Sequence, residues 1–206
     1  KKKEKYKKLK EIFSLISTNK TIIYCNTVDS VVSLYKDMKN DDFSVECLHG
    51  NMTKTERMSI YEKFRVGDTR VLISSDLTAR GIDIQQISMV VNYEITPNTN
   101  TYLHRIGRSG RYGRKGWAIN FVTKQDLITV RELERVYNID MQELPSNFQL
   151  LEPKRNLNHI CQNVPVKTAE DMVQNFEDLQ NFGNTYGNKS DLSPKNNNVM
   201  QMVVGD

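Results

Sequence analysis

A dense run of cationic and small residues stands between positions 104 and 111, where the chain reads HRIGRSGR. If this segment is helical, His104, Arg108 and Arg111 share one face, because four and three residues separate them. A histidine and two guanidinium groups on one face repel each other unless they face an anion, and the forked guanidinium suits phosphate oxygens. The segment therefore predicts a phosphate-binding surface, with a solvated basic helix face as the alternative.

The residues around this segment alternate between strand and helix patterns. Short apolar runs predict strands, and amphipathic spacing or capping signals predict the helices between them. The expected strands are residues 21–25, 44–48, 70–74, 88–93 and 117–122, and the expected helices lie at about 9–16, 28–38, 53–64, 102–111 and 123–137. Apolar strands that alternate with helices are typical of a parallel sheet covered on both faces. The expected fold class is therefore α/β, a doubly wound parallel sheet.

Small polar residues follow four of the expected strands. They read Asn26-Thr27, His49-Gly50, Ser75-Asp76 and Asn92-Tyr93. Ligands of open α/β sheets bind beyond the carboxyl ends of the strands, and free amides at helix N-termini attract anions. These strand ends predict an edge that binds phosphates, and the ordinary polarity of loops is the alternative.

The charge of the chain is concentrated at one end. The net charge is +4 over 206 residues, yet the first ten residues hold seven Lys and one Glu, and residues 11–150 hold seventeen bases and seventeen acids. A uniformly basic surface that coats nucleic acid is therefore excluded. No apolar run is long enough for a transmembrane helix. Three widely spaced cysteines without a C-x-x-C pair argue against a zinc site and for a reducing compartment.

Four motifs together resemble the C-terminal RecA-like domain of DEAD-box RNA helicases, and the match is densest with the translation initiation factor 4A type. They are IYCNT, HGNMTKTER, SSDLTARGID and HRIGRSGR, in that order. The resemblance implies a helicase C-terminal domain at residues 1–151 with a RecA-like fold. Residues 152–206 are outside it and read as an Asn-rich, largely irregular tail, with one short helix expected near 170–182 and a partner-binding role left open.

The resemblance implies the C-terminal half of an ATP-dependent RNA helicase, which unwinds RNA duplexes or remodels RNA–protein complexes. Translation initiation in the cytoplasm is the expected setting, and a nuclear role stays open. The expected partners are RNA, an N-terminal RecA-like domain of the same protein and a scaffold protein of translation initiation, with no membrane. Two other interpretations remain: a non-catalytic helicase-like module that binds a scaffold or RNA, and a DNA-acting relative.

The resemblance also implies roles on the nucleotide side. Arg111 matches the arginine finger that contacts the γ-phosphate of ATP, Arg108 matches its neighbour, and His104 matches a residue that links the two helicase domains. Gly81 and Asp83 match the position that meets the ribose. ATP and Mg²⁺ would be held mainly by the N-terminal domain, because these residues include no G-x-x-x-x-G-K-[ST] loop and no D-E-A-D box. The chain alone is therefore expected to be inactive as an ATP hydrolase.

On the RNA side the resemblance implies backbone contacts that carry no base sequence. Hydroxyl, amide and glycine positions suit phosphate and 2′-hydroxyl groups. The matching residues are Asn26, Thr27, Gly50, Lys54, Arg57 and Ser75. Lys54 stands where the family usually has glutamine. Its side chain is expected either to contact a phosphate or to be solvated, and the sequence favours neither.

Overall fold

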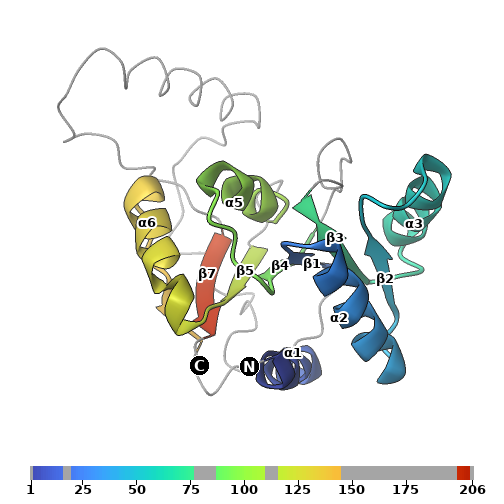
Figure 1. Ribbon diagram of the computed structural model, residues 1–206, viewed down its shortest axis with the longest axis horizontal. Coiled ribbons are helices and arrows are strands. Elements are labelled where there is room, and N and C mark those ends of the chain that lie inside the picture. Colours follow the sequence, from blue (N-terminus) through green and yellow to red (C-terminus); the bar gives the residue numbers. More distant parts are fainter. Residues whose placement is uncertain (1, 16–19, 77–86, 110–115, 145–198, 205–206) are drawn as a thin grey trace, which may run out of the picture. The chain divides into compact units, whose positions relative to one another are not determined.

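A parallel sheet is the central element of the computed structural model, which describes residues 2–15, 20–76, 87–109, 116–144 and 199–204 (Figure 1). Among these residues the sheet has seven strands in the spatial order β2-β3-β1-β4-β5-β7-β6. They are β1 (Thr21–Cys25), β2 (Val45–Leu48), β3 (Val71–Ser75), β4 (Met89–Asn92), β5 (Gly116–Phe121), β6 (Gln142–Glu143) and β7 (Val199–Val204). Every neighbouring pair runs parallel, so the predicted parallel sheet is confirmed. The described residues all belong to one unit, formed by residues 1–152 and 196–206.

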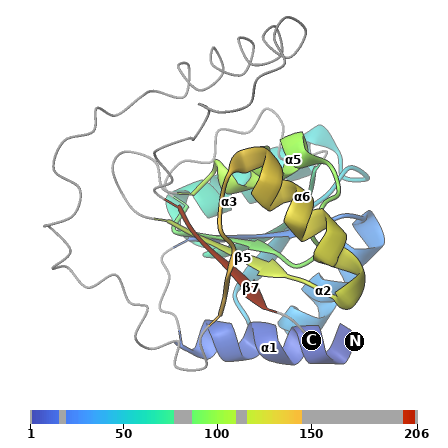
Figure 2. The same cartoon turned by 90° about the vertical axis from the view of Figure 1, so that its left-hand side faces the viewer.

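Helices cover both faces of this sheet. They are α1 (Lys2–Leu15), α2 (Val28–Asn40), α3 (Lys54–Val66), α5 (Thr99–Ile106) and α6 (Leu127–Tyr137), with a 3₁₀ turn, η1 (Lys124–Asp126), before α6. Figure 2 shows α1 and α2 on one side of the sheet and α3, α5 and α6 on the other. This is the doubly wound arrangement that the sequence predicted. No helix among the described residues is both long enough and apolar enough to cross a bilayer.

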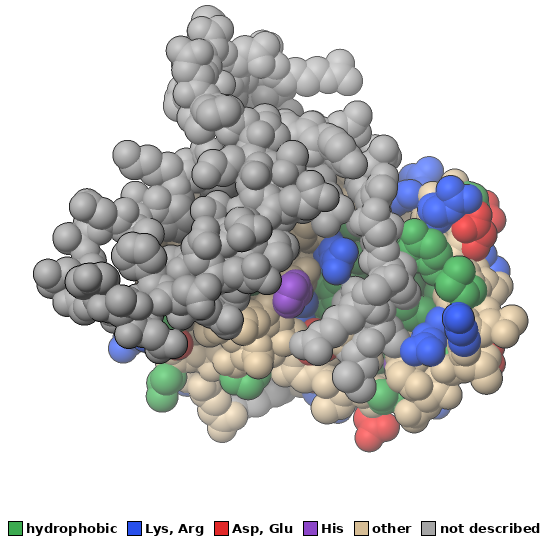
Figure 3. Space-filling model, turned by 90° about the horizontal axis from the view of Figure 1, so that it is seen from above, with side chains coloured by type: hydrophobic (Ala, Val, Ile, Leu, Met, Phe, Trp, Pro, Cys, Tyr) green, Lys and Arg blue, Asp and Glu red, His purple; other side chains and the backbone are tan. Residues whose placement is uncertain are grey.

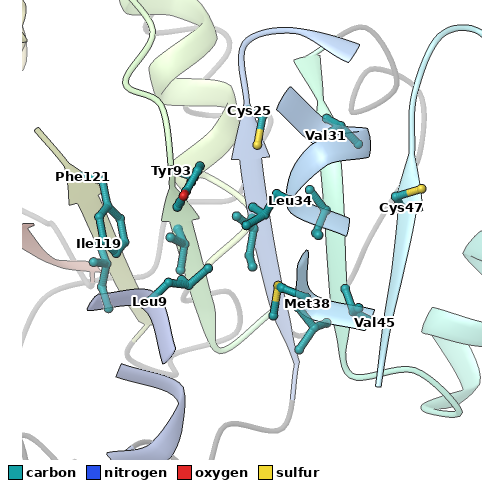
Figure 4. Packing of buried hydrophobic residues seen from close by; sticks show 14 of the residues in the cluster. Leu9, Cys25, Val31, Leu34, Met38, Val45, Cys47, Tyr93, Ile119 and Phe121 are labelled. Atoms are coloured by element: carbon teal, nitrogen blue, oxygen red, sulfur yellow. The ribbon is translucent and has the colours of Figure 1, made fainter. Parts of the chain in front are cut away.

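Apolar strand residues alternate between the two faces and form the core. In β1, Ile23 and Cys25 pack in the cluster with α1 and α2, whereas Ile22 and Tyr24 pack in the cluster with α3. Figure 4 shows the first cluster, in which Leu9 of α1 lies among side chains from the strands and α2. Each buried side chain of this size contributes about 1.5–3 kcal/mol. Because β1, β3 and β4 are buried along their whole length, they need apolar residues on both faces.

The polar strand ends lie at one edge of the sheet, as the sequence predicted. β1 lies between β3 and β4, with Cys25 opposite Ser75 and Tyr24 opposite Asn92. The chain leaves β1 for strands on one side and later returns to the other side, so the strand order reverses here. Ligand crevices of open α/β sheets form at such a reversal. We therefore expect a ligand site among the residues that follow β1, β3 and β4.

Helix α5 ends earlier than the sequence predicted. The expected helix ran to residue 111, but α5 ends at Ile106 with Gly107 as its C-cap. The Arg108 N–H then donates to the carbonyl oxygen of Arg105 at 3.3 Å, a tighter turn of the kind that often ends a helix. A Cβ at Gly107 would lie 3.0 Å from a backbone oxygen one turn earlier, so the local turn itself favours glycine. Arg108 therefore lies beyond the helix rather than on a helical face with His104.

Two strands were not predicted. β6 has only two residues, and β7 lies at 199–204, within the segment assigned to an irregular tail. Residues 199–204 pair with residues 116–121 of β5 and separate β5 from β6. β6 is too short to carry a local signal. The sequence of β7, VMQMVV, is apolar enough for a strand, but its pairing depends on an available edge elsewhere in the sheet. The helix expected near 170–182 lies outside the described residues.

A capping box fixes the start of α3. The Glu56 N–H donates to Thr53 Oγ1 at 3.3 Å, and the Thr53 N–H donates to the Glu56 carboxylate at 2.7 Å. These reciprocal hydrogen bonds are those that the T-x-x-E pattern predicted. The hydrogen bonds from the N–H and hydroxyl of Thr53 lower the pKa of Glu56. At the other end Gly67 has a φ of 94°, a left-handed conformation that glycine adopts without strain.

We expect Thr53→Ala to lower the free energy of unfolding by about 1 kcal/mol, because the Glu56 N–H loses its acceptor. Urea denaturation followed by circular dichroism measures this change. Ser59→Ala, at an exposed position within α3, is the control, and it should change the free energy by less than about 0.5 kcal/mol. Equal effects of the two substitutions would contradict the capping role.

Candidate nucleic-acid interface

One buried arginine lies at the reversal point of the sheet. Arg105, in the last turn of α5, is 1% exposed. Arginine is rarely buried to this extent unless its charge is paired. The guanidinium donates to Asp76, which follows β3, and to Asn26, which follows β1. It also donates to Asn92 in β4 and to the carbonyl oxygen of Glu94. A single side chain thus joins the carboxyl ends of three neighbouring strands.

The shortest of these contacts form an ion pair with Asp76. Nε and Nη2 of Arg105 donate to the two carboxylate oxygens at 2.6 Å each. The Asp76 side chain is 28% exposed, so solvent reaches the pair only from the carboxylate side. A forked arginine–carboxylate pair fixes orientation as well as charge, and a lysine cannot reproduce the fork. The pair therefore holds the end of α5 against the end of β3.

The remaining guanidinium donors are also satisfied. Nη2 donates to Asn26 Oδ1 at 2.8 Å, and Nη1 donates to the Glu94 carbonyl oxygen at 2.8 Å and to Asn92 Oδ1 at 3.2 Å. The five N–H groups of an arginine side chain thus have five acceptors. Asn92 in turn donates to Asn120 of β5 at 2.8 Å, which extends the network to a fourth strand. A buried charge with every donor satisfied is an ordered part of the structure.

Glu94 connects the end of β4 to the start of α2. Its carboxylate accepts hydrogen bonds from the Asn26 N–H and the Ser30 hydroxyl, both at 2.7 Å. The Asn26 amide nitrogen donates to the Ile95 carbonyl oxygen at 3.0 Å. Thr27, the N-cap of α2, accepts from the Ser30 N–H at 3.1 Å. The side chain of Asn26 is thus engaged in internal hydrogen bonds at both its oxygen and its nitrogen.

The apolar side of the guanidinium lies against Tyr24. The guanidinium carbon of Arg105 is 5.2 Å from the centroid of the Tyr24 ring, within the range of a cation–π contact. Burial raises the pKa of Tyr24 to about 12, although the charges of Arg108 and Arg105 partly oppose this shift. The phenol is therefore neutral at physiological pH.

The structure describes two of the five residues expected on the nucleotide side. His104 is exposed in the last turn of α5, and Arg108 is half-buried just after that helix. Arg111, Gly81 and Asp83 lie outside the described residues. His104 directly precedes the anchored Arg105, and Arg108 directly follows Gly107, the C-cap of α5. Both residues therefore lie near the carboxyl edge.

The residues expected on the RNA side come from α2, the turn after β2, β3 and α3, which all end or begin at this edge. Thr27 begins α2, Gly50 is exposed in the turn after β2, and Ser75 is buried at the end of β3. Lys54 is exposed at the start of α3, and Arg57 is half-buried one turn later. Neither Lys54 nor Arg57 forms an ion pair with a described residue. Figure 3 shows basic side chains beside hydrophobic ones over α3.

A cavity of about 400 Å³ opens beside Gly50, between α2 and the segment after β2. Its lining includes the cation Lys36 and the carboxylate Asp29. These opposite charges balance, so the cavity adds no anion-binding field of its own.

Sequence reasoning missed the role of Arg105. The sequence showed it only as one member of a basic cluster, yet it is the most fully bonded side chain of the edge. A signal was present, because Arg105 shares the buried face of α5 with Tyr102 and Ile106 at helical spacing. A cation on an apolar face requires a buried partner, and Asp76 directly follows a buried strand.

The donor set of the edge suits phosphate rather than a metal ion. No group of three or more His, Cys, Asp or Glu side chains that could hold a metal occurs among the described residues. Of the cationic and imidazole side chains named above, His104 and Lys54 are exposed and Arg108 and Arg57 are half-buried, and all four carry hydrogen-bond donors. Such groups bind phosphate oxygens through charge-assisted hydrogen bonds. The edge therefore fits a nucleotide phosphate or a nucleic-acid backbone.

Comparison with known proteins agrees with this chemistry. Residues 4–113 match the family described as "Helicase conserved C-terminal domain". The ATP-dependent RNA helicase eIF4A of Saccharomyces cerevisiae is 46% identical over 147 residues, which are 71% of this chain and 37% of that protein. The chain thus spans little more than a third of the length of this relative.

Two solved structures show the same fold. The C-terminal domain of the DEAD-box protein Dbp5 has a TM-score of 0.64 and 37% identity, over 69% of this chain and 83% of that one. S. cerevisiae Dbp5 bound to RNA and ADP BeF3 has a TM-score of 0.63 and 37% identity, over 66% of this chain and 37% of that one. The doubly wound sheet described above is therefore of the RecA-like kind found in these domains.

We expect Arg105→Ala to lower the free energy of unfolding by about 3–5 kcal/mol, because it leaves the Asp76 carboxylate and three further acceptors without their donor. Chemical denaturation measures the change. Arg135→Ala is the matched control, since Arg135 pairs with Glu132 at 2.6 Å but is 62% exposed. An exposed pair of this kind contributes at most about 1 kcal/mol. A similar small effect at Arg105 would refute its structural role.

We expect the two buried thiols to be unreactive in the native protein. Burial raises the pKa of Cys25 far above its usual value and raises the pKa of Cys47 to about 11. Because the thiolate is the reacting form, a rise to 11 lowers the reactive fraction of Cys47 about 100-fold. The variant Cys161→Ser removes the third cysteine, so that only Cys25 and Cys47 can react. At pH 8 the rate of their reaction with a chromogenic disulfide should be at least about 100-fold lower in the native protein than in the protein unfolded in urea. Rapid labelling of the native protein would contradict this expectation.

Proposed function

This chain belongs to the family of conserved helicase C-terminal domains and is of the DEAD-box, eIF4A-like kind, and on this premise we propose that it forms the C-terminal half of an ATP-dependent RNA helicase. The observation that carries the proposal is the anchored carboxyl edge. Arg105 binds the ends of β3, β1 and β4, and the basic segment that continues from it starts from this fixed point. An edge so fixed can present cations to a partner with little loss of conformational entropy.

On the nucleotide side, Arg111 serves as the arginine finger toward the γ-phosphate of ATP, and Arg108 binds in the same site. His104 links this domain to the N-terminal RecA-like domain, which holds most of the ATP and its Mg²⁺. Gly81 and Asp83 contact the ribose, because a carboxylate accepts hydrogen bonds from hydroxyl groups. Support comes from the motif match and from the position of His104 and Arg108 at the carboxyl edge.

On the RNA side, Thr27, Gly50, Lys54, Arg57 and Ser75 grip the sugar-phosphate backbone without reading bases. Their elements begin or end at the same edge, and within the described part of the chain the two cations among them have no ion-pair partner that would compete with a phosphate. Asn26 has a different role in this proposal. Since its amide group already bonds to Arg105 and Ile95 and its N–H to the Glu94 carboxylate, it positions the start of α2 beside the RNA-binding residues.

The proposed process is duplex unwinding or remodelling of RNA–protein complexes in cytoplasmic translation initiation, with a scaffold protein as partner. The support is the 46% identity to eIF4A. The chain alone is expected to lack ATPase activity, because a phosphate-binding loop and magnesium ligands must come from the N-terminal domain.

We expect Arg111→Ala to lower RNA-stimulated ATP hydrolysis by about 10³- to 10⁵-fold in the protein that includes the N-terminal domain. The guanidinium neutralises charge that develops on the transferred phosphoryl group, a contribution of roughly 4–7 kcal/mol. Steady-state phosphate release measures the rate, and fluorescence anisotropy with a single-stranded RNA measures binding, which should be partly retained.

Arg131→Ala, at an exposed position in α6, removes the same type of side chain and is the control. It should leave the ATPase rate within about twofold of the unaltered protein. Near-normal turnover in Arg111→Ala would refute the finger assignment. Loss of RNA binding together with turnover would instead point to a folding defect.

A further inference from the structure

The first helix carries an unusual concentration of positive charge. The first ten residues hold seven Lys and one Glu, whereas residues 11–150 have as many acids as bases. Lys2, Lys3 and Lys7 are exposed on α1. Because Lys3 and Lys7 are four residues apart, their side chains lie side by side on the helix. We refer to Lys2, Lys3 and Lys7 as the α1 lysine surface.

This arrangement is electrostatically unfavourable for the isolated domain. The N-terminal end of a helix is the positive end of its dipole and favours acidic residues, yet the first turn of α1 has a single acid, Glu4, and its last turn has no base. Like charges at a spacing of four residues also repel each other. The helix is held by its apolar face, where Leu9 is 0% and Ile12 is 3% exposed. An anionic partner would relieve this repulsion.

Other lysines of α1 already have internal partners. Lys10 pairs with Asp41 at 2.9 Å, and Lys8 pairs with Glu11 at 3.2 Å. Lys5 donates to the carbonyl oxygen of Tyr93 at 3.3 Å. The α1 lysine surface, in contrast, forms no ion pair with a described residue. Its charges are therefore available to a ligand.

The first turn of α1 lies near the carboxyl end of β4. Besides the contact from Lys5, the Tyr93 hydroxyl donates to the Lys2 carbonyl oxygen at 3.5 Å. Tyr93 directly follows β4, and its N–H donates to the Tyr24 carbonyl oxygen of β1 at 3.0 Å. Neighbouring strands are about 4.8 Å apart, so the start of α1 is close to the strand end that carries Asn26. Figure 2 shows α1 along the lower face of the sheet, with the N-terminus at one end of it.

We propose that the α1 lysine surface binds the phosphate backbone of an RNA strand and extends the RNA-binding edge beyond the strand ends. This inference rests on the proposed function. Ammonium groups on flexible stems suit phosphates at variable positions and read no sequence. A protein partner would need an apolar contact area as well. The large exposed apolar side chains of the described residues lie on α3 and α6, and none lies on α1.

The test removes two charges from this surface in the 206-residue chain. In the variant Lys3→Gln/Lys7→Gln, the dissociation constant for a fluorescein-labelled single-stranded oligouridylate is measured from 50 to 200 mM salt. Each lost phosphate contact lowers the slope of log affinity against log salt by about 0.7, so the double variant should lose about 1.4. The unaltered chain should then lose about sevenfold more affinity over this salt range than the variant.

Lys39→Gln/Lys63→Gln is the matched control. It removes the same charge from the last turns of α2 and α3, at the opposite ends of those helices from the carboxyl edge. It should keep the salt slope of the unaltered chain. An equal loss of slope in both double variants would show an effect of net charge alone and would overturn the proposal, as would an unchanged slope in Lys3→Gln/Lys7→Gln.

Two further measurements separate the alternatives. The melting temperature of Lys3→Gln/Lys7→Gln should be unchanged or higher, because repulsion within α1 is relieved; a lower one would mean that weaker binding reflects unfolding, against the proposal. A polyglutamate peptide should bind the unaltered chain and the variant alike, and selective loss of that binding would instead assign the surface to an acidic protein. If Arg57→Ala weakens RNA binding and Lys3→Gln/Lys7→Gln does not, this inference fails and the proposed function stands.

Discussion

The structure depends on one buried positive charge. The guanidinium of Arg105 is removed from water at the point where the order of the strands reverses, and it remains stable there because five acceptors surround it. Removing a charge from water is costly unless it is paired and hydrogen-bonded. The acceptors belong to the ends of separate strands, so the condition is met only when β3, β1 and β4 end in register. The polar edge is thus as ordered as the apolar core beneath it.

This constraint divides the basic residues of the chain into two kinds. All the donors of Arg105 are bound by internal acceptors, and Lys10 pairs with the Asp41 carboxylate on the surface. Lys54 and the α1 lysine surface are exposed, so their charges are open to solvent or to a ligand. The internal pairs hold the helices in place, and the accessible cations surround the edge that they define. Although residues 11–150 carry no net charge, the domain can therefore still present a local positive field to phosphate.

Hydrogen bonding at the strand ends also limits which polar groups can contact a ligand. Glu94 accepts hydrogen bonds from Asn26 and Ser30, and Asn26 is further bound by Arg105. These side chains set the angle at which α2 leaves the sheet. Contacts to a nucleic-acid backbone must then come from the backbone and hydroxyl groups that this network holds in place, together with nearby cations. Such contacts are independent of base sequence.

Local patterns of apolar residues and helix caps were enough to predict the parallel sheet, the limits of β1, the capping box at Thr53 and the edge where small polar residues gather. The tertiary structure was needed to show that Arg105 is a buried anchor. It also decided that β7 pairs with β5. The anchor and the pairing of β7 with β5 depend on groups far apart in the sequence, such as Arg105 and Asp76, which are 29 positions apart. No local pattern encodes such a contact, since it arises when distant strand ends meet.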